Sequence, residues 1–193
     1  AARSLGIQYL TLYAFSSENW KRPAAEINDL MGLMRLYIKR ELADLHRNNV
    51  RMRFIGDPAP LPADIQELIA DATRTTSGNT GLNLIIALNY GGQNEIVKAV
   101  QSLAEKVAAG NIHPGDITPR LLADHLDTAG IPDPDLMIRT SGEQRLSNFL
   151  LWQLAYSELV FLDTLWPDFT SEDMAQAVAE FQRRERRYGA ASA

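Results

Sequence analysis

The chain has 193 residues, of which 46% are hydrophobic and 22% charged, and its formal net charge is −5. These values are typical of one soluble globular domain, and the negative charge gives no support to a nucleic-acid partner. The lack of cysteine excludes disulfides, thiolate nucleophiles and zinc–thiolate sites, and no apolar run is long enough to predict a transmembrane helix.

Five apolar runs rich in β-branched and aromatic residues predict strands at 7–15, 50–56, 82–90, 136–140 and 158–163. Amphipathic patterns between them predict helices at about 26–47, 62–75, 93–109, 119–127, 147–154 and 171–187. Strands that alternate with helices are typical of βαβ units. The sequence therefore predicts an α/β fold with a mostly parallel central sheet and helices on both faces. The run at 82–90 is apolar on both sides and fits a central strand.

The predicted helix at 26–47 is apolar over an unusually wide face. A stripe from Ile27 to Leu45 follows the helical period, and Leu33, Leu36 and Tyr37 widen it. Such a face suits a helix buried between a sheet and its neighbours. It also suits a helix that packs on the sheet with one side and lines an apolar cavity with the other.

Three polar clusters follow predicted strands at their carboxyl ends, where ligands bind in open α/β sheets. They are FSSENWKRP at 15–23, NYGG at 89–92 and RTSGEQRLSN at 139–148. An ordinary turn and helix cap explain the first more readily than a site does, and a tight strand–helix junction explains the second. The third combines two arginines, hydroxyl side chains and a predicted helix start, which suits a phosphate or diphosphate.

Other catalytic arrangements find little support. There is no G-x-S-x-G nucleophile elbow, and the three histidines indicate neither a Ser–His relay nor a metal site. Glu158, at the start of the last predicted strand, is either a site carboxylate or a solvated strand end. The residues alone indicate a diphosphate-binding α/β protein with an apolar cleft.

Four segments carry a more specific resemblance: LTLYAFSSENWKRP, NYGG, DLMIRTSGEQRLSNFLLWQLAYSEL and LWPDF. In this order and spacing they resemble the cis-prenyltransferases, over essentially the whole chain. The resemblance implies a transferase that adds isopentenyl diphosphate units in cis to farnesyl diphosphate. The implied product is a long-chain polyprenyl diphosphate such as undecaprenyl diphosphate, a lipid-carrier precursor for cell-wall polysaccharides. The resemblance also implies Mg²⁺ as cofactor, a homodimer, and a cytoplasmic protein that is at most peripheral at the inner face of the plasma membrane.

The resemblance assigns roles to the residues that match the family's motifs. Arg139, Arg145 and Ser147 would hold the isopentenyl diphosphate, and Glu158 would help to hold Mg²⁺. Asn19 would assist proton loss. The closing segment and the positions beside the reacting carbons would comprise Phe15, Ser16, Glu18, Trp20 and Arg22. The tunnel for the growing chain would be lined by Leu30, Leu33, Met34 and Leu82. Arg187 and Gly189 would reach the isopentenyl site of a partner subunit.

The family's first strand and its Asp-Gly-Asn-Gly-Arg loop do not occur in these residues. The resemblance therefore implies a single domain over 1–193 that begins downstream of them. Three alternatives stay open: a non-catalytic prenyltransferase-like subunit, a synthase of another product length, and an unrelated phosphate-binding module. The presence of Arg139, Arg145, Ser147 and Glu158 favours a catalyst over a non-catalytic subunit.

Overall fold

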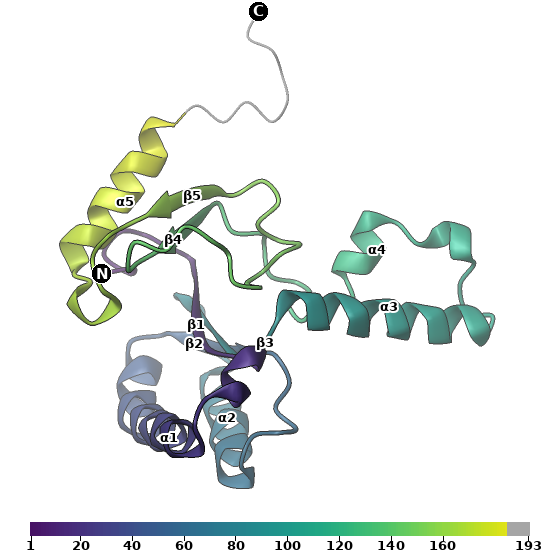
Figure 1. The fold of residues 1–193 in the computed structure, drawn as a ribbon, viewed down its shortest axis with the longest axis horizontal. Helices are drawn as coiled ribbons and strands as arrows, with labels where there is room; N and C mark the ends of the chain where they lie inside the picture. The colour runs from purple at the N-terminus through teal and green to yellow at the C-terminus, as the bar shows by residue number, and fades with distance from the viewer. Residues whose placement is uncertain (185–193) are drawn as a thin grey trace, which may run out of the picture. The chain divides into compact units, whose positions relative to one another are not determined.

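A computed structural model describes residues 1–184 of the chain (Figure 1). The chain divides into two compact units. Unit 1 comprises Ala1–Gly6 and the residues from Ile131 onward, and unit 2 comprises Ile7–Gly130. The predicted α/β class with parallel strands is confirmed, with the strands paired in two sheets. The expectation of one domain over the whole chain stays a prediction.

Unit 2 is built on a three-stranded parallel sheet. Its strands are β1 (Tyr9–Ser16), β2 (Arg51–Ile55) and β3 (Asn83–Tyr90), in the order β1-β3-β2. The strand predicted to be central is central. It is buried on both faces. Ile85 and Ala87, on one face, are 0% exposed, and Leu88, on the other face, is 2% exposed. Because the strands are parallel, their carboxyl ends all lie at the same end of the sheet. The sequence places two of its polar clusters at this end.

Two helices of unit 2 cover one side of this sheet (Figure 1). They are α1 (Ala24–Arg47) and α2 (Ala63–Thr76). The core between them and the sheet contains the buried residues Phe15, Met31, Leu61, Ile65 and Leu88. This core uses only part of the wide apolar face of α1, because Leu33, Leu36 and Tyr37 are 49–55% exposed.

Unit 2 has further helical elements, of which α3 is long and the others are short. They are η1 (Ser17–Lys21), α3 (Gly92–Ala108), η2 (Pro114–Asp116) and α4 (Pro119–Ala123). The helix predicted at 119–127 therefore ends four residues early. Thr118 caps its start by accepting a hydrogen bond from the Leu121 backbone N–H at 3.1 Å. Within the described residues, no helix combines the length and apolar character needed to cross a bilayer.

Unit 1 contains the parallel pair β4 (Leu136–Arg139) and β5 (Glu158–Phe161), the turn η3 (Trp166–Asp168) and the helix α5 (Ser171–Arg183). The capping box predicted for α5 is present. The Thr170 backbone N–H donates to Asp173 Oδ2 at 2.7 Å, and the Asp173 N–H donates to Thr170 Oγ1 at 3.2 Å. The predicted end of this helix at 187 lies outside the described residues.

The helix predicted at 147–154 is wrong, since these residues form a series of turns. Ser147, Asn148 and Leu150 have φ values of 49°, 62° and 44°, which a right-handed helix does not allow. The apolar pattern there reflects burial instead, because Leu150 and Leu154 are only 3% and 7% exposed. The expected helix start beside Arg145 is therefore replaced by left-handed backbone.

Candidate functional site

The structure brings Arg139, Arg145 and Ser147 together at the carboxyl end of β4. Arg139 Nη1 donates a hydrogen bond to Ser147 Oγ at 2.9 Å and another to the backbone oxygen of Arg145. Both contacts lie in the loop that follows the strand. One guanidinium therefore fixes two points of residues 140–148 and keeps its charge beside them.

The backbone of this loop is held at its base and is left-handed at several points. The Ser141 N–H donates to the Thr164 oxygen at 2.8 Å, and the Gly142 N–H donates to the Leu162 oxygen at 2.9 Å. The residues with positive φ include the pairs Ser141–Gly142 and Ser147–Asn148. Non-glycine residues in this conformation are costly and cluster at functional sites, and successive backbone N–H groups in turns can form anion-binding concavities.

The second guanidinium of the loop is open to solution. Arg145 Nη1 pairs with Glu143 Oε2, and the two side chains are 64% and 40% exposed. Exposed ion pairs of this kind contribute little stability. An incoming anion can therefore take the place of Glu143 at small cost.

Glu158 lies at the opposite end of this strand pair from Arg139. The register pairs Leu136 with Glu158 and Arg139 with Phe161. Glu158 Oε2 accepts a hydrogen bond from Arg184 Nη1 at 2.8 Å, and Arg184 also contacts Glu180 and the Leu159 oxygen. Within unit 1, the structure does not bring Glu158 to the arginine loop.

In unit 2, residues 16–22 form a compact turn after β1. Asn19 Oδ1 accepts a hydrogen bond from the Ser16 backbone N–H at 2.9 Å, and the Arg22 N–H donates to the Asn19 oxygen at 3.0 Å. Glu18 is exposed, and Arg22 forms an exposed ion pair with Glu26. The segment is thus internally hydrogen-bonded while its charged side chains face solvent.

Trp20 attaches this segment to the core of unit 2. Its ring meets the buried Phe15 ring edge to face, with centroids 5.1 Å apart. Its Nε1 donates a hydrogen bond to Asn89 Oδ1 at 2.8 Å. Residues of the first and second polar clusters therefore meet at the carboxyl ends of the strands, as expected from a parallel sheet.

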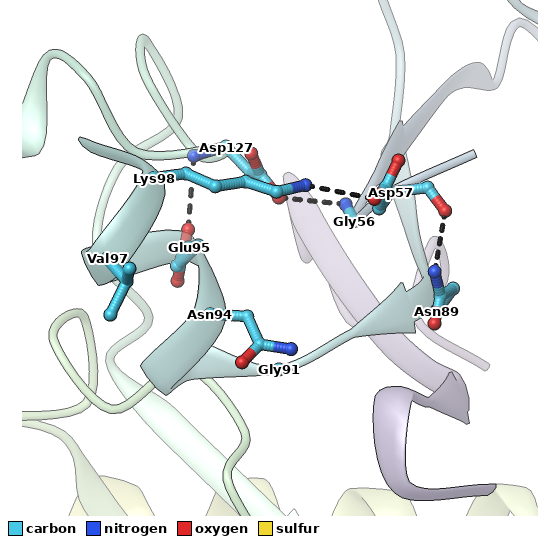
Figure 2. Close-up of a pocket in the computed structure, with 9 residues that line it drawn as sticks. All are labelled: Gly56, Asp57, Asn89, Gly91, Asn94, Glu95, Val97, Lys98 and Asp127. Carbon is cyan, nitrogen blue, oxygen red and sulfur yellow. Dashed lines mark hydrogen bonds and ion pairs between the residues drawn. The ribbon is translucent and has the colours of Figure 1, made fainter. Parts of the chain in front are cut away.

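A polar cavity of about 270 Å³ adjoins Asn89 (Figure 2). Lys98 Nζ lies 3.3 Å from Asp57 Oδ2, the Gly56 N–H donates to Asp127 Oδ2 at 3.0 Å, and the Asp127 N–H donates to Glu95 Oε2 at 3.1 Å. The backbone hydrogen bond from Ala59 and the neighbouring Lys98 hold the pKa of Asp57 below its usual value. Gly56 makes this arrangement possible, because its φ is 104° and an added Cβ would lie 2.0 Å from the Leu88 oxygen.

Beneath the turn, Tyr13 joins β1 to the end of β3. Its hydroxyl donates to the Tyr90 oxygen at 3.1 Å. Burial, with a further contribution from the nearby Glu18 carboxylate, raises the pKa of Tyr13 to about 12. The phenol is therefore a neutral structural donor at physiological pH.

Comparison with known proteins identifies the family. The family model described as "Putative undecaprenyl diphosphate synthase" matches residues 1–189. The chain is 60% identical over 189 residues to an isoprenyl transferase of Brucella suis, with 98% of this chain and 74% of that protein covered. It is 57% identical over 188 residues to an isoprenyl transferase of Rhizobium meliloti, with coverages of 97% and 76%. The chain belongs to the cis-prenyltransferase family.

Solved structures agree with this membership. A lavandulyl diphosphate synthase from Lavandula x intermedia, solved in complex with dimethylallyl diphosphate, superposes with a TM-score of 0.95 at 38% identity. The match covers 97% of this chain and 81% of that one. A probable undecaprenyl diphosphate synthase from Campylobacter jejuni gives a TM-score of 0.87 at 36% identity, with coverages of 97% and 86%. The chain is thus a cis-prenyltransferase enzyme, and its family extends isoprenoid chains in cis.

The tunnel predicted for this cis-prenyltransferase stays a prediction. Leu30 and Met34 are partly buried against the core of unit 2, whereas Leu33 is 49% exposed. Leu82 precedes β3, at the amino end of the sheet. A second cavity of about 300 Å³ is lined by residues such as Phe54, Leu61 and Ile69, and none of the four predicted tunnel residues contributes to it.

Mg²⁺ binding by this cis-prenyltransferase stays a prediction. Glu158 is paired with Arg184, and no group of three or more His, Asp or Glu side chains in residues 1–184 is placed to hold a metal ion. Arg187 and Gly189, expected to reach a partner subunit, lie outside the described residues.

Sequence reasoning missed the polar network behind the turn. The sequence indicates Asn89 only as part of a strand–helix junction, and it assigns no role to Asp57, Glu95, Lys98 or Asp127. One signal was available for Asp57, which lies two residues after the end of β2, at the carboxyl end of the parallel sheet. No sequence pattern connects Asp127 to it across 70 residues.

Proposed function

We propose that this cis-prenyltransferase condenses isopentenyl diphosphate units in cis onto farnesyl diphosphate. The product in this proposal is undecaprenyl diphosphate, a precursor of the lipid carrier for cell-wall polysaccharides. Because that product is a lipid, the proposal includes peripheral contact with the inner face of the plasma membrane. The loop after β4 is the observation that supports the proposal most, since it gathers two guanidiniums, a serine hydroxyl and left-handed backbone in one place.

In each condensation a carbon–carbon bond forms between the isopentenyl unit and the allylic carbon, and the allylic carbon–oxygen bond breaks. The leaving diphosphate keeps the electron pair, and the isopentenyl unit loses a proton. We assign Arg139, Arg145 and Ser147 to the isopentenyl diphosphate, because charge-assisted donors fixed in one loop hold and orient a phosphate group. Arg139 is held by its contact to Ser147 before any substrate binds.

We assign the turn after β1 to the reacting carbons. Phe15 and Ser16 would lie beside them, and Glu18, Trp20 and Arg22 would belong to the segment that closes over them and excludes water. Asn19 is not itself a base, since an amide does not accept a proton near neutral pH. With Oδ1 accepting from the Ser16 N–H, its remaining role in proton loss is to donate from Nδ2 and orient the group that takes the proton.

Mg²⁺ belongs to this proposal as a companion of the substrate diphosphate. Mg²⁺ keeps several waters and usually binds through one or two carboxylates plus substrate phosphates. A single carboxylate such as Glu158, already paired with Arg184, is consistent with a metal that arrives with its substrate. The metal would neutralise charge on the leaving diphosphate.

We also propose a homodimer, with Arg187 and Gly189 reaching the isopentenyl site of the partner subunit. The family resemblance is one support. The other is the exposure of three apolar side chains that lie close in the sequence of unit 1, since Phe161, Leu165 and Trp166 are 36%, 56% and 59% exposed. Exposed apolar patches of this kind mark interaction surfaces.

The decisive test is turnover of farnesyl and isopentenyl diphosphates by the purified protein, with product lengths determined by chromatography. Calorimetry should then show that Arg139→Ala weakens isopentenyl diphosphate binding by about 1.5–3 kcal/mol, the usual value of a charge-assisted hydrogen bond. Arg120→Ala is the matched control, because Arg120 is an 89% exposed arginine on α4. Unchanged affinity of Arg139→Ala for isopentenyl diphosphate would overturn the assignment of the loop. If chromatography finds only products shorter than undecaprenyl diphosphate, the proposed product becomes a shorter polyprenyl diphosphate.

A further inference from the structure

Asn89 connects the segments that contain Trp20 and Asp57 through both ends of its side chain. Its Oδ1 accepts from Trp20 Nε1 at 2.8 Å, and its Nδ2 donates to the Asp57 backbone oxygen at 2.9 Å. The side chain is 9% exposed. The amide orientation is fixed by chemistry, since an indole N–H only donates and a carbonyl oxygen only accepts.

The backbone at Asn89 is as specific as the side chain. Its φ is 46°, and the β1–β3 register shifts at Phe15 and again at Ser16, next to it. Irregularities of this kind re-aim side chains at sheet edges and beside active sites. Asparagine tolerates left-handed backbone better than most residues. Aspartate would lack the N–H donor for the Asp57 oxygen. The position therefore needs an acceptor for Trp20, a donor for Asp57 and a residue that tolerates left-handed backbone, and asparagine meets all three needs.

Besides packing against the core of unit 2, Trp20 makes two directed contacts with residues of the sheet. Phe15 contacts its ring, and Asn89 accepts from its Nε1. An aromatic edge contact leaves the indole able to pivot, whereas a hydrogen bond to a buried partner fixes its direction. Because residues 16–22 are hydrogen-bonded among themselves, a fixed Trp20 orients the whole turn.

We propose that Asn89 is a positioning residue that sets the pose of the Ser16–Arg22 turn by holding Trp20. The inference rests on the proposed function in one respect, the assignment of this turn to the reacting carbons. Asn89 itself acts through Trp20. The network around the cavity in Figure 2 supports it from behind, since Lys98 pairs with Asp57 and Asp57 supplies the oxygen that Asn89 needs.

The test uses Asn89→Gly, which keeps the left-handed backbone accessible while deleting both hydrogen bonds. Trp20→Phe removes the same indole contact from the other end and retains an aromatic ring against Phe15. Asn94→Ala, which lines the same cavity from α3, is the matched control. Hydrogen exchange of peptides covering 16–22 should speed up by about 2–13-fold in the first two variants, as expected for one net hydrogen bond. Exchange in α2 should not change.

Kinetics then separate this inference from the proposed function. We expect kcat/KM to fall by a similar factor in Asn89→Gly and Trp20→Phe, and the double variant to lose little more than either alone, because both variants remove the Trp20–Asn89 hydrogen bond. Unchanged exchange at 16–22 in both variants would overturn the positioning role. Faster exchange with unchanged kcat/KM would overturn the link to catalysis and the proposed role of the turn. It would not affect the assignment of the isopentenyl site, which the Arg139→Ala variant tests separately.

Discussion

Arg139 illustrates how much of a candidate site a single residue can organise. Its guanidinium contacts Ser147 and the Arg145 backbone, so the three residues grouped by the sequence are also grouped in space. That grouping was predictable, because all three lie within nine positions of one strand end. The position of Glu158 was not, since the strand register that carries it away from Arg139 depends on pairing between β4 and β5.

Asn89 shows the limit of prediction at the same scale. Its place at the end of a central strand followed from the apolar run before it. Its contacts did not, because Trp20 and Asp57 approach from other parts of the chain and the left-handed backbone has no clear signature in NYGG. The cavity network of Asp57, Glu95, Lys98 and Asp127 was missed for the same reason.

Tyr13 provides a pH-dependent prediction. Its pKa in the folded chain is raised to about 12, while an unfolded tyrosine titrates near 10. Because its pKa is raised, the folded chain favours the protonated phenol of Tyr13. The contribution of this phenol to the free energy of unfolding is therefore fully present below about pH 10 and is lost as the pH rises toward 12. Tyr13→Phe also loses the hydrogen bond to the Tyr90 oxygen, so it should be less stable than the parent by about 0.5–1.5 kcal/mol at pH 9.

The stability gap between Tyr13→Phe and the parent should close between about pH 10 and 12. Urea unfolding at several alkaline pH values measures it. Tyr9→Phe, which alters a 39% exposed tyrosine on the same strand, serves as the matched control. A gap for Tyr13→Phe that stays constant over this range would contradict the prediction.

Among the elements, the strands and long helices were predicted most reliably, because their apolar periods extend over many residues. The segment at 147–154 failed for a local reason. Its apolar residues are spaced like one helical face, but three left-handed residues prevent the helix. Propensity and period do not report φ, so a turn with buried leucines is indistinguishable from a short helix at the level of sequence.

The helix α1 provides the prediction at the scale of elements. Leu33 is half exposed outside the core of unit 2, and Met34 is partly buried against it. If this face meets the growing isoprenoid chain, Leu33→Trp or Met34→Trp should fill the available space and shorten the products, and Leu82→Ala should lengthen them. Chromatography of products from farnesyl and isopentenyl diphosphates measures the distribution.

Val100→Trp is the control for these α1 variants, because Val100 is 52% exposed on a different helix. It should leave product length as in the parent enzyme. An unaltered distribution in all three test variants would show that this face of α1 does not contact the product.

At the scale of the molecule, the α/β class and the family were within reach of the sequence. The pairing of strands in two sheets was not, since it depends on long-range contacts that no local pattern encodes. The family assignment succeeded because several motifs occur in a fixed order over the whole chain, and independent motifs in order are far more specific than any one of them.

The proposed homodimer gives the prediction at this scale. Sedimentation at micromolar concentration should yield about twice the chain mass. Leu165→Glu places a charge at one of the exposed apolar side chains of unit 1 and should shift the protein toward a monomer, because an unpaired charge is costly to bury in an interface. Val100→Glu, on α3, should remain dimeric. A parent protein that is monomeric and fully active would contradict the proposal.

The division of the chain has a consequence for how it is made. Unit 2 is continuous, whereas unit 1 needs Ala1–Gly6 and the residues from Ile131 onward, and a left-handed glycine lies at each crossing, Gly6 and Gly130. On the ribosome, every strand and helix of unit 2 has been synthesised by residue 130, while residues 1–6 still lack their partners. Units fold as they are completed, and distant contacts form late because loop closure is entropically costly. The Trp20–Asn89 contact is therefore expected to form before the arginine loop is free to pack, because the whole of unit 2 precedes that loop in the chain.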